Sequence, residues 1–205
     1  MPRAFTESEK QTIRARLLQA GRELFSRYGL RKTTVEELVR AAGIAKGTFY
    51  LFFPSKEALY AEVLLSVVPD MVETLLERSF GVAEDIREAL VLYQKELVRL
   101  IEENELVRAI TTDRSSWENL FSVDWAEYRR RGFASLKPLV EKIREAQARG
   151  EIVEGDPWEL VQLLGIIKIL PLYKDQIVPE QYPRLVDRLA QVIADGLTCP
   201  ARRRG

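Results

Sequence analysis

The sequence of 205 residues contains no histidine and a single cysteine, Cys199. Histidine is the commonest general base and the commonest zinc ligand, so its absence rules out Ser-His and Cys-His nucleophile pairs. One cysteine forms no intrachain disulfide and leaves thiolate metal sites without ligands. A glycine-rich phosphate-binding loop is also missing. The sequence therefore argues against an enzyme, and it predicts no metal and no cofactor.

Long apolar runs are missing as well. The longest, LLGIIKILPLY at residues 163–173, is too short to span a bilayer and is interrupted by Lys168 and Pro171. The first ten residues lack the apolar segment of a secretion signal. We expect a cytoplasmic protein with no membrane partner.

The formal net charge is zero, but the charges are unevenly distributed along the chain. Residues 1–56 hold 11 basic and five acidic residues, a net charge of +6, which leaves −6 for the remainder. A basic segment on an acidic body is typical of binding to nucleic acid or to a membrane surface. The alternative explanation for the basic segment is that its helices have arginine-rich faces that only contact solvent.

Helical periodicity runs through nearly the whole chain and predicts an all-α protein. A first helix is expected over 7–28, started by a Thr6/Glu9 capping box and stopped by Gly29. A second helix follows Thr34, where Thr34 and Glu37 form another capping box, and ends at Gly43. The apolar stripe of the first helix comprises Ile13, Leu17, Ala20, Leu24 and Tyr28.

The remaining helices bring the expected total to about nine. Ser55 caps a long helix over 56–79 that contains Pro69, and Asp156-Pro157 starts another that is apolar on nearly all faces as far as Pro171. Further helices are predicted over 84–103, 105–112, 116–149 and 179–195, the 116–149 helix opening on a Ser115/Glu118 capping box.

The stretch FYLFF at residues 49–53 would suit a buried strand if it stood alone. It follows a short helix and a glycine-containing turn, however, which is the pattern of a helix-turn-helix. As a helix, it turns Phe49 and Phe53 inward as an apolar anchor. Lys56 could reach a phosphate from the next helix. The opposite face presents Lys46, Gly47, Thr48, Tyr50 and Leu51, small residues and donors that suit a DNA groove.

Residues 13–60 resemble the N-terminal DNA-binding domain of the tetracycline-repressor (TetR) family. The matching residues are Ala20, Leu24-Phe25, Gly29, Thr33-Thr34-Val35, Leu38, Ala42-Gly43-Ile44, Gly47-Thr48-Phe49-Tyr50, Phe53, Ser55-Lys56-Glu57 and Leu59. The resemblance implies a DNA-binding domain at 1–54 and a larger helical ligand-binding and dimerisation domain at 55–205. It implies a homodimer that binds a palindromic double-stranded DNA operator, most often as a repressor, and a small-molecule effector that releases it.

The resemblance also assigns roles within the helix-turn-helix. Tyr50 and Lys56 match positions that bind phosphates, and Thr34 or its neighbour Thr33 matches a position that contacts the DNA backbone. Phe52 departs from the pattern, because many members have His or Tyr there. Phe52 could touch a thymine methyl or lie against Lys56.

The second domain offers weaker signals. The resemblance implies a dimer interface on the last two long helices, and the apolar segment 160–170 supports it. The residues predicted for this interface, with intrachain core as the alternative, are Leu160, Leu164, Ile167, Leu185, Leu189 and Ile193. The aromatic stripe Trp117, Phe121, Trp125 and Tyr128 predicts either core packing or one wall of an effector pocket, joined by Tyr93, Lys168 and Tyr173. Lys168 must pair, extend to solvent or meet an anionic ligand.

Two other function classes stay open at this stage. A helical adaptor could use the same helix-turn-helix corner to bind protein instead of DNA. An all-α enzyme could use paired carboxylates such as Glu102, Glu103, Glu105 or Asp113, although the three glutamates suit a solvated helix end and no partner base is identifiable.

Overall fold

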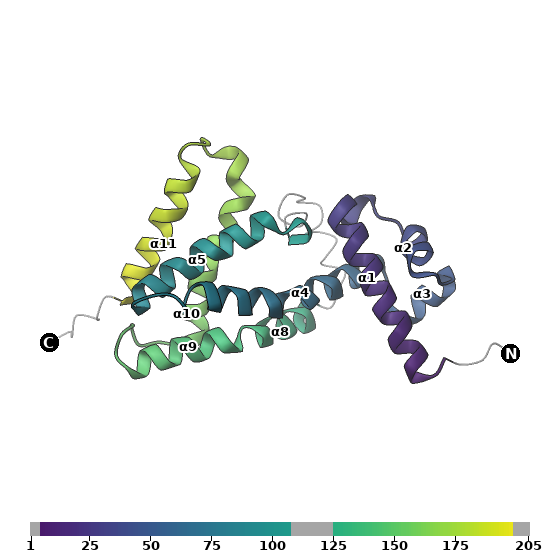
Figure 1. Cartoon of the computed structure of the whole chain (residues 1–205), viewed down its shortest axis with the longest axis horizontal. Helices are drawn as coiled ribbons and strands as arrows, with labels where there is room; N and C mark the ends of the chain where they lie inside the picture. The colour runs from purple at the N-terminus through teal and green to yellow at the C-terminus, as the bar shows by residue number, and fades with distance from the viewer. Residues whose placement is uncertain (1–4, 108–124, 199–205) are drawn as a thin grey trace. The chain divides into compact units, whose positions relative to one another are not determined.

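The computed structural model describes residues 5–107 and 125–198. This part of the chain holds ten helical segments and no strand, which confirms the all-α prediction (Figure 1). None of these helices combines the length and the apolar character needed to cross a lipid bilayer. The chain divides into two compact units, one formed by residues 1–67 and 105–131 and the other by residues 68–104 and 132–205. The predicted boundary at residue 54 lies before this division.

The first unit begins with α1 (Glu7–Lys32), which starts at the predicted Thr6/Glu9 capping box. Gly29 interrupts the helix with a φ of 74°, a left-handed value that favours glycine. The apolar stripe is confirmed as far as Leu24, which is half-buried. Tyr28 was expected on that stripe, but it is 43% exposed, and the Arg27 guanidinium lies over its ring.

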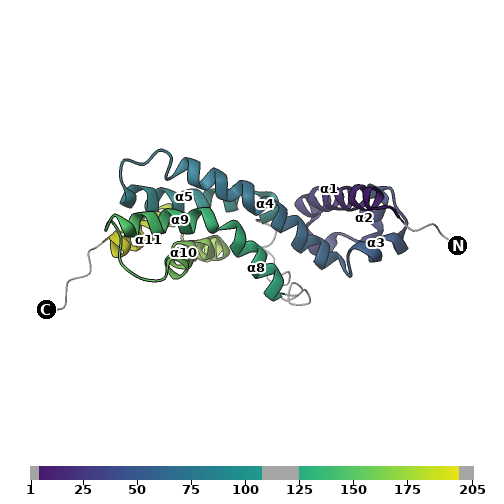
Figure 2. The ribbon, with the colours of Figure 1, turned by 90° about the horizontal axis from the view of Figure 1, so that it is seen from below.

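Two short helices follow and lie on one side of α1 (Figure 1 and Figure 2). The first, α2 (Val35–Ala42), has the predicted Thr34/Glu37 capping box and ends at Gly43, whose φ of 66° places it in the left-handed region. The second, α3 (Lys46–Phe52), contains FYLF of the FYLFF stretch, which confirms the predicted helix and excludes a strand there.

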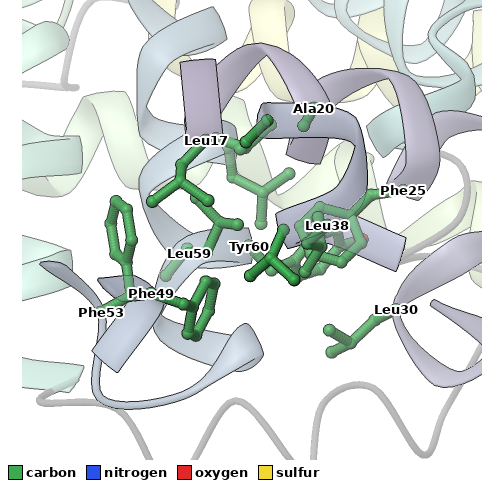
Figure 3. Packing of buried hydrophobic residues seen from close by; sticks show 14 of the residues in the cluster. Leu17, Ala20, Phe25, Leu30, Leu38, Phe49, Phe53, Leu59 and Tyr60 are labelled. Carbon is green, nitrogen blue, oxygen red and sulfur yellow. The ribbon is translucent and has the colours of Figure 1, made fainter. Parts of the chain in front are cut away.

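Helix α4 (Lys56–Arg78) begins at Ser55, whose hydroxyl oxygen accepts the Ala58 N–H at 3.2 Å as predicted. Pro69 lies within α4 and does not end it. The part of α4 up to Val67 closes the core of the first unit, where Leu59 and Tyr60 are fully buried. Figure 3 shows this core, which also contains Leu17, Ala20, Phe25, Leu30, Leu38, Phe49 and Phe53.

An ion-pair cluster joins three helical segments of the first unit. The carboxylate of Glu62 on α4 accepts hydrogen bonds from Arg14 on α1, at 2.7 Å, and from Arg131 on α8 (Trp125–Ser135). Partial burial alone would raise the pKa of Glu62, but the two guanidinium groups hold that pKa below its ordinary value. Glu62 is therefore ionised and paired at neutral pH.

The second unit contains α5, α9, α10, a 3₁₀ segment η1 and α11. Asp85 caps α5 (Ile86–Glu103), and α11 (Tyr182–Thr198) packs along it. Asp156 accepts the Trp158 N–H and caps α10 (Pro157–Leu164), as the Asp-Pro start predicts.

Two expectations about helix continuity are wrong. The predicted helix over 116–149 divides at Leu136, so that α8 is followed by a separate α9 (Lys137–Ala148) with Pro138 in its first turn, where proline is tolerated. Its predicted Ser115/Glu118 start lies outside the described residues. The helix expected from Asp156 to Pro171 is α-helical only as far as Leu164, and η1 (Gly165–Gln176) continues it as a 3₁₀ helix that contains Pro171.

Candidate nucleic-acid interface

Helix α3 has one buried and one exposed face. The side chains of Phe49 and Phe53 are 0% and 3% exposed, and their ring centroids are 6.1 Å apart in the core (Figure 3). On the other face, Tyr50 is 50% and Leu51 72% exposed. The predicted division of this helix is confirmed. The two buried rings hold α3 in the core of the first unit, so that its other face is exposed.

Gly47 lies on the exposed face, in the first turn of α3. Its backbone is helical, and a Cβ added there would meet no atom within 4 Å. Glycine within a helix is less stable than alanine, so the fold itself gives no reason for a glycine at this position. A glycine at this position would instead let another molecule approach the backbone of α3 closely.

Lys46, the first residue of α3, is paired across the turn. Its ammonium donates a hydrogen bond to the carboxylate of Glu36 on α2 at 2.5 Å, and both side chains are more than half exposed. Nothing in the sequence pattern points to Glu36, because a contact between residues ten positions apart across a turn leaves no periodic signal. Thr48, which is also predicted to lie on the DNA-facing side of this helix, is half-buried.

The two threonines before α2 differ completely. Thr33 is fully buried, and its hydroxyl donates to the carbonyl oxygens of Gly29 at 2.8 Å and Leu24 at 3.3 Å. The prediction that the Thr33 side chain contacts DNA is therefore wrong, since its hydroxyl is buried and hydrogen-bonded to carbonyl oxygens of α1. Thr34 is exposed, and its hydroxyl oxygen accepts the Glu37 N–H in the capping box. Of the pair, Thr34 remains the residue predicted to contact DNA.

Lys56 lies where α4 meets the end of α1. Its ammonium donates to the carbonyl oxygens of Leu30 and Thr33, each at 2.8 Å, and of Arg31 at 3.4 Å. An ammonium has three N–H donors, and carbonyls at a helix end lack partners within the helix. Lys56 therefore stabilises the end of α1. The predicted phosphate contact would require it to exchange at least one of these bonds.

Phe52, which departs from the family pattern, is half-buried and packs against the core of the first unit. Its ring contributes to the anchor, and part of it remains accessible beside the exposed face of α3.

Helix α3, with Gly47 and the exposed Tyr50, lies within a segment that matches a known protein family. Residues 17–63 match the model of the bacterial regulatory proteins of the tetR family. Residues 17–63 therefore form a TetR-type DNA-binding segment. KstR2, an HTH-type transcriptional repressor of Rhodococcus jostii (strain RHA1), is 31% identical over 117 residues. The match covers 49% of this chain and 57% of KstR2, so it spans little more than half of that relative.

Solved structures confirm the TetR-type fold. A TetR-family regulator from Pectobacterium atrosepticum aligns with a TM-score of 0.72 and 23% identity, covering 96% of this chain and all of that one. The crystal structure of RolR in complex with resorcinol aligns with a TM-score of 0.68 and 18% identity, covering 94% of this chain and 98% of RolR.

The residues predicted for a TetR-type effector pocket are not brought together in the described structure. Tyr93 is buried in the core of the second unit, where burial raises the pKa of its hydroxyl, while Lys168 and Tyr173 are exposed. Trp117 and Phe121 lie outside the described residues, as do the side chains of Trp125 and Tyr128. No group of acidic or cysteine side chains in the described residues is arranged to hold a metal ion.

The second unit does contain a groove between α4 and the junction of α8 with α9. Its volume is 720 Å³, within the usual range for ligand sites. Apolar residues form most of its wall, and two glutamates of α4 also line it. The lining consists of Pro69, Val72, Glu73, Leu76, Glu77, Ala134, Ser135 and Pro138.

The residues predicted for a TetR-type dimer interface divide into two groups. Leu164 and Ile167 are fully buried in intrachain cores, so their assignment to a dimer surface is wrong. Leu160, Leu189 and Ile193 are half-buried against those cores, and Leu185 is 43% exposed. Other exposed apolar side chains of this region, which the sequence did not predict, are Leu163, Ile166, Ile169, Tyr173, Val178 and Val192.

Gly47→Ala should separate stability from DNA binding. We expect the free energy of unfolding to rise by about 0.5–1 kcal/mol, because alanine favours the helix and the added methyl has room. DNA binding should weaken by about 1–2 kcal/mol, the scale of one lost base contact. Urea unfolding and fluorescence anisotropy on labelled duplex DNA measure the two quantities. Equal or tighter DNA binding would show that the backbone at Gly47 does not approach DNA.

Lys56→Met should lower the free energy of unfolding by about 1.5–3 kcal/mol, since carbonyl oxygens at the end of α1 lose a charged donor. The matched control is Lys32→Met, which removes an exposed lysine near the same helix end. Thermal unfolding of both variants measures the difference. Equal melting temperatures for the two variants would show that the Lys56 bonds do not hold α1 and α4 together.

Proposed function

We propose that the protein is a homodimeric transcriptional repressor that inserts α3 into the major groove of a palindromic operator. The division of α3 carries the proposal, because Phe49 anchors the helix while Lys46, Gly47 and Tyr50 face outward. A helix of this length needs such an anchor to hold a defined angle in a groove. In this proposal the exposed Tyr50 donates its phenolic hydrogen to a phosphate.

An exposed apolar surface on the second unit supports the dimer. Ile166 and Ile169 are three residues apart in η1 and share one face, because a 3₁₀ helix has three residues per turn. On α11, Leu185 and Val192 are two turns apart and share a face as well. Exposed apolar patches of this kind usually mark protein contacts, and a two-fold axis would let each copy cover the other. The exposed apolar side chains of α10, η1 and α11 on which this proposal rests are Leu163, Ile166, Ile169, Leu185 and Val192.

The effector is proposed to be a small, largely apolar molecule bound in the groove along α4. The groove has suitable volume and an apolar wall, and the fold is shared with RolR, whose structure contains resorcinol. An effector that binds better to one conformation of the dimer shifts the population toward it. Release from DNA follows if the favoured conformation holds the two α3 helices at a spacing that does not fit adjacent grooves, about 34–36 Å apart.

Selection of duplex DNA from a random pool tests this function directly. We expect the wild-type protein to enrich a palindromic sequence and to bind it with an affinity that falls steeply as salt rises. A reporter gene placed behind the enriched sequence should be repressed when the protein is present. Failure to bind any duplex at low salt would exclude the proposed function, and activation of the reporter would exclude repression.

A further inference from the structure

The ion pair between Glu36 and Lys46 places a carboxylate beside the first residue of α3, which we call the reading helix because it is proposed to enter the DNA groove. The Glu36 side chain is 59% exposed and the Lys46 side chain 55%, so solvent reaches both. The hydrogen bond to Lys46 lowers the pKa of the Glu36 carboxyl, and the same bond raises the pKa of the Lys46 ammonium. Both groups are therefore charged at neutral pH.

The pair contributes little to folding. Exposed ion pairs have small net effects on stability, because water solvates the separate charges almost as well. α2 and α3 are already held by Leu38, Val39 and Phe49 in the core. We therefore expect the pair to affect binding at the exposed face of α3 and not the stability of the fold.

The position of the pair determines what it can do there. Lys46 and Tyr50 are four residues apart on α3 and lie on the same face. Glu36 is in the first turn of α2, where the N–H of Glu37 is already taken by Thr34 and two carboxylates are clustered. A phosphate approaching this turn would meet negative charge, whereas an uncharged base edge would not be repelled.

We propose that Glu36 is a specificity-determining positioning residue, which holds Lys46 over the first turn of α3 and keeps its ammonium away from phosphates. The inference rests on the proposed DNA-binding function. A lysine held in this way contributes to recognition of base edges but little to binding that ignores sequence. Without the carboxylate, the flexible lysine side chain reaches the nearest phosphate and strengthens binding to any duplex.

Glu36→Gln tests the proposal on two labelled duplexes, one of scrambled sequence and one that the wild-type protein selects from a random pool. We expect binding to the scrambled duplex to tighten roughly fivefold, and its dependence on log salt to steepen by about 0.9 per bound protomer, the effect of one added phosphate contact. The preference for the selected duplex should fall by a similar factor. The control Glu23→Gln removes the same charge from an exposed position on α1 and should leave that preference unchanged.

A double-variant cycle shows whether the effect passes through Lys46. Glu36→Gln should have no effect on preference or salt dependence when Lys46 is already glutamine. An equal effect in that background would overturn the proposal, because the carboxylate would then act by its charge alone. Unchanged preference and salt dependence in Glu36→Gln would overturn it as well. A wild-type protein that binds neither duplex would instead contradict the proposed function, and the two failures are therefore distinguishable.

Discussion

Replacing Val192 by aspartate is expected to convert the proposed dimer into monomers. Val192 is 56% exposed on α11, in the stripe that contains Leu185. A carboxylate at this position would be buried against apolar side chains of the second copy without a partner, which is strongly unfavourable. The isolated chain keeps the side chain in solvent, so folding should be preserved. Sedimentation at several protein concentrations measures the change of mass.

The same substitution should weaken operator binding by about 100-fold or more. A dimer holds its second reading helix at high effective concentration once the first has bound, and that gain is lost in a monomer. Val82→Asp is the matched control, because Val82 is 66% exposed but lies in the loop between α4 and α5. A dimeric Val192→Asp protein with normal affinity would place the interface elsewhere on the chain.

The sequence predicted the parts of the fold that depend on local chemistry. Capping by Thr6, Thr34 and Ser55 requires only a side-chain oxygen near a helix start, and these residues act as expected. Gly43 ends α2 because the left-handed conformation there favours glycine. Phe49 and Phe53 are inward because helical spacing puts them on one face and no other face of that segment is equally apolar.

The sequence could not decide matters that depend on tertiary packing. Adjacent threonines at 33 and 34 are equivalent in composition, and only the fold shows that the hydroxyl of Thr33 closes α1. The segment around Ile167 is apolar on nearly all faces, so periodicity cannot tell which stripe turns inward. The change from α-helix to 3₁₀ helix at Gly165 also alters the angle between successive residues. In this segment Ile166 is 49% exposed, while its neighbour Ile167 is buried.

Phe49→Ala should have the largest effect on stability. The ring is fully buried, and its centroid lies 5.3 Å from that of Tyr50 in an edge-on arrangement. Removing it leaves a cavity and loses the transfer free energy of the ring, which together lower the free energy of unfolding by about 3–5 kcal/mol. Amide hydrogen exchange followed by mass spectrometry should show loss of protection in peptides from α1, α2 and α3. The second unit has its own core and should keep its protection.

Leu51→Ala, two residues away on the same helix, is the matched control. Leu51 is 72% exposed, so truncation removes little buried surface and should change the free energy of unfolding by less than about 0.5 kcal/mol. Its effect should fall on DNA binding, because the side chain projects from the reading face. The two variants therefore separate the anchor of α3 from its surface. Equal loss of exchange protection in both would contradict that separation, since a helix with one buried and one exposed face cannot respond alike to truncation on either side.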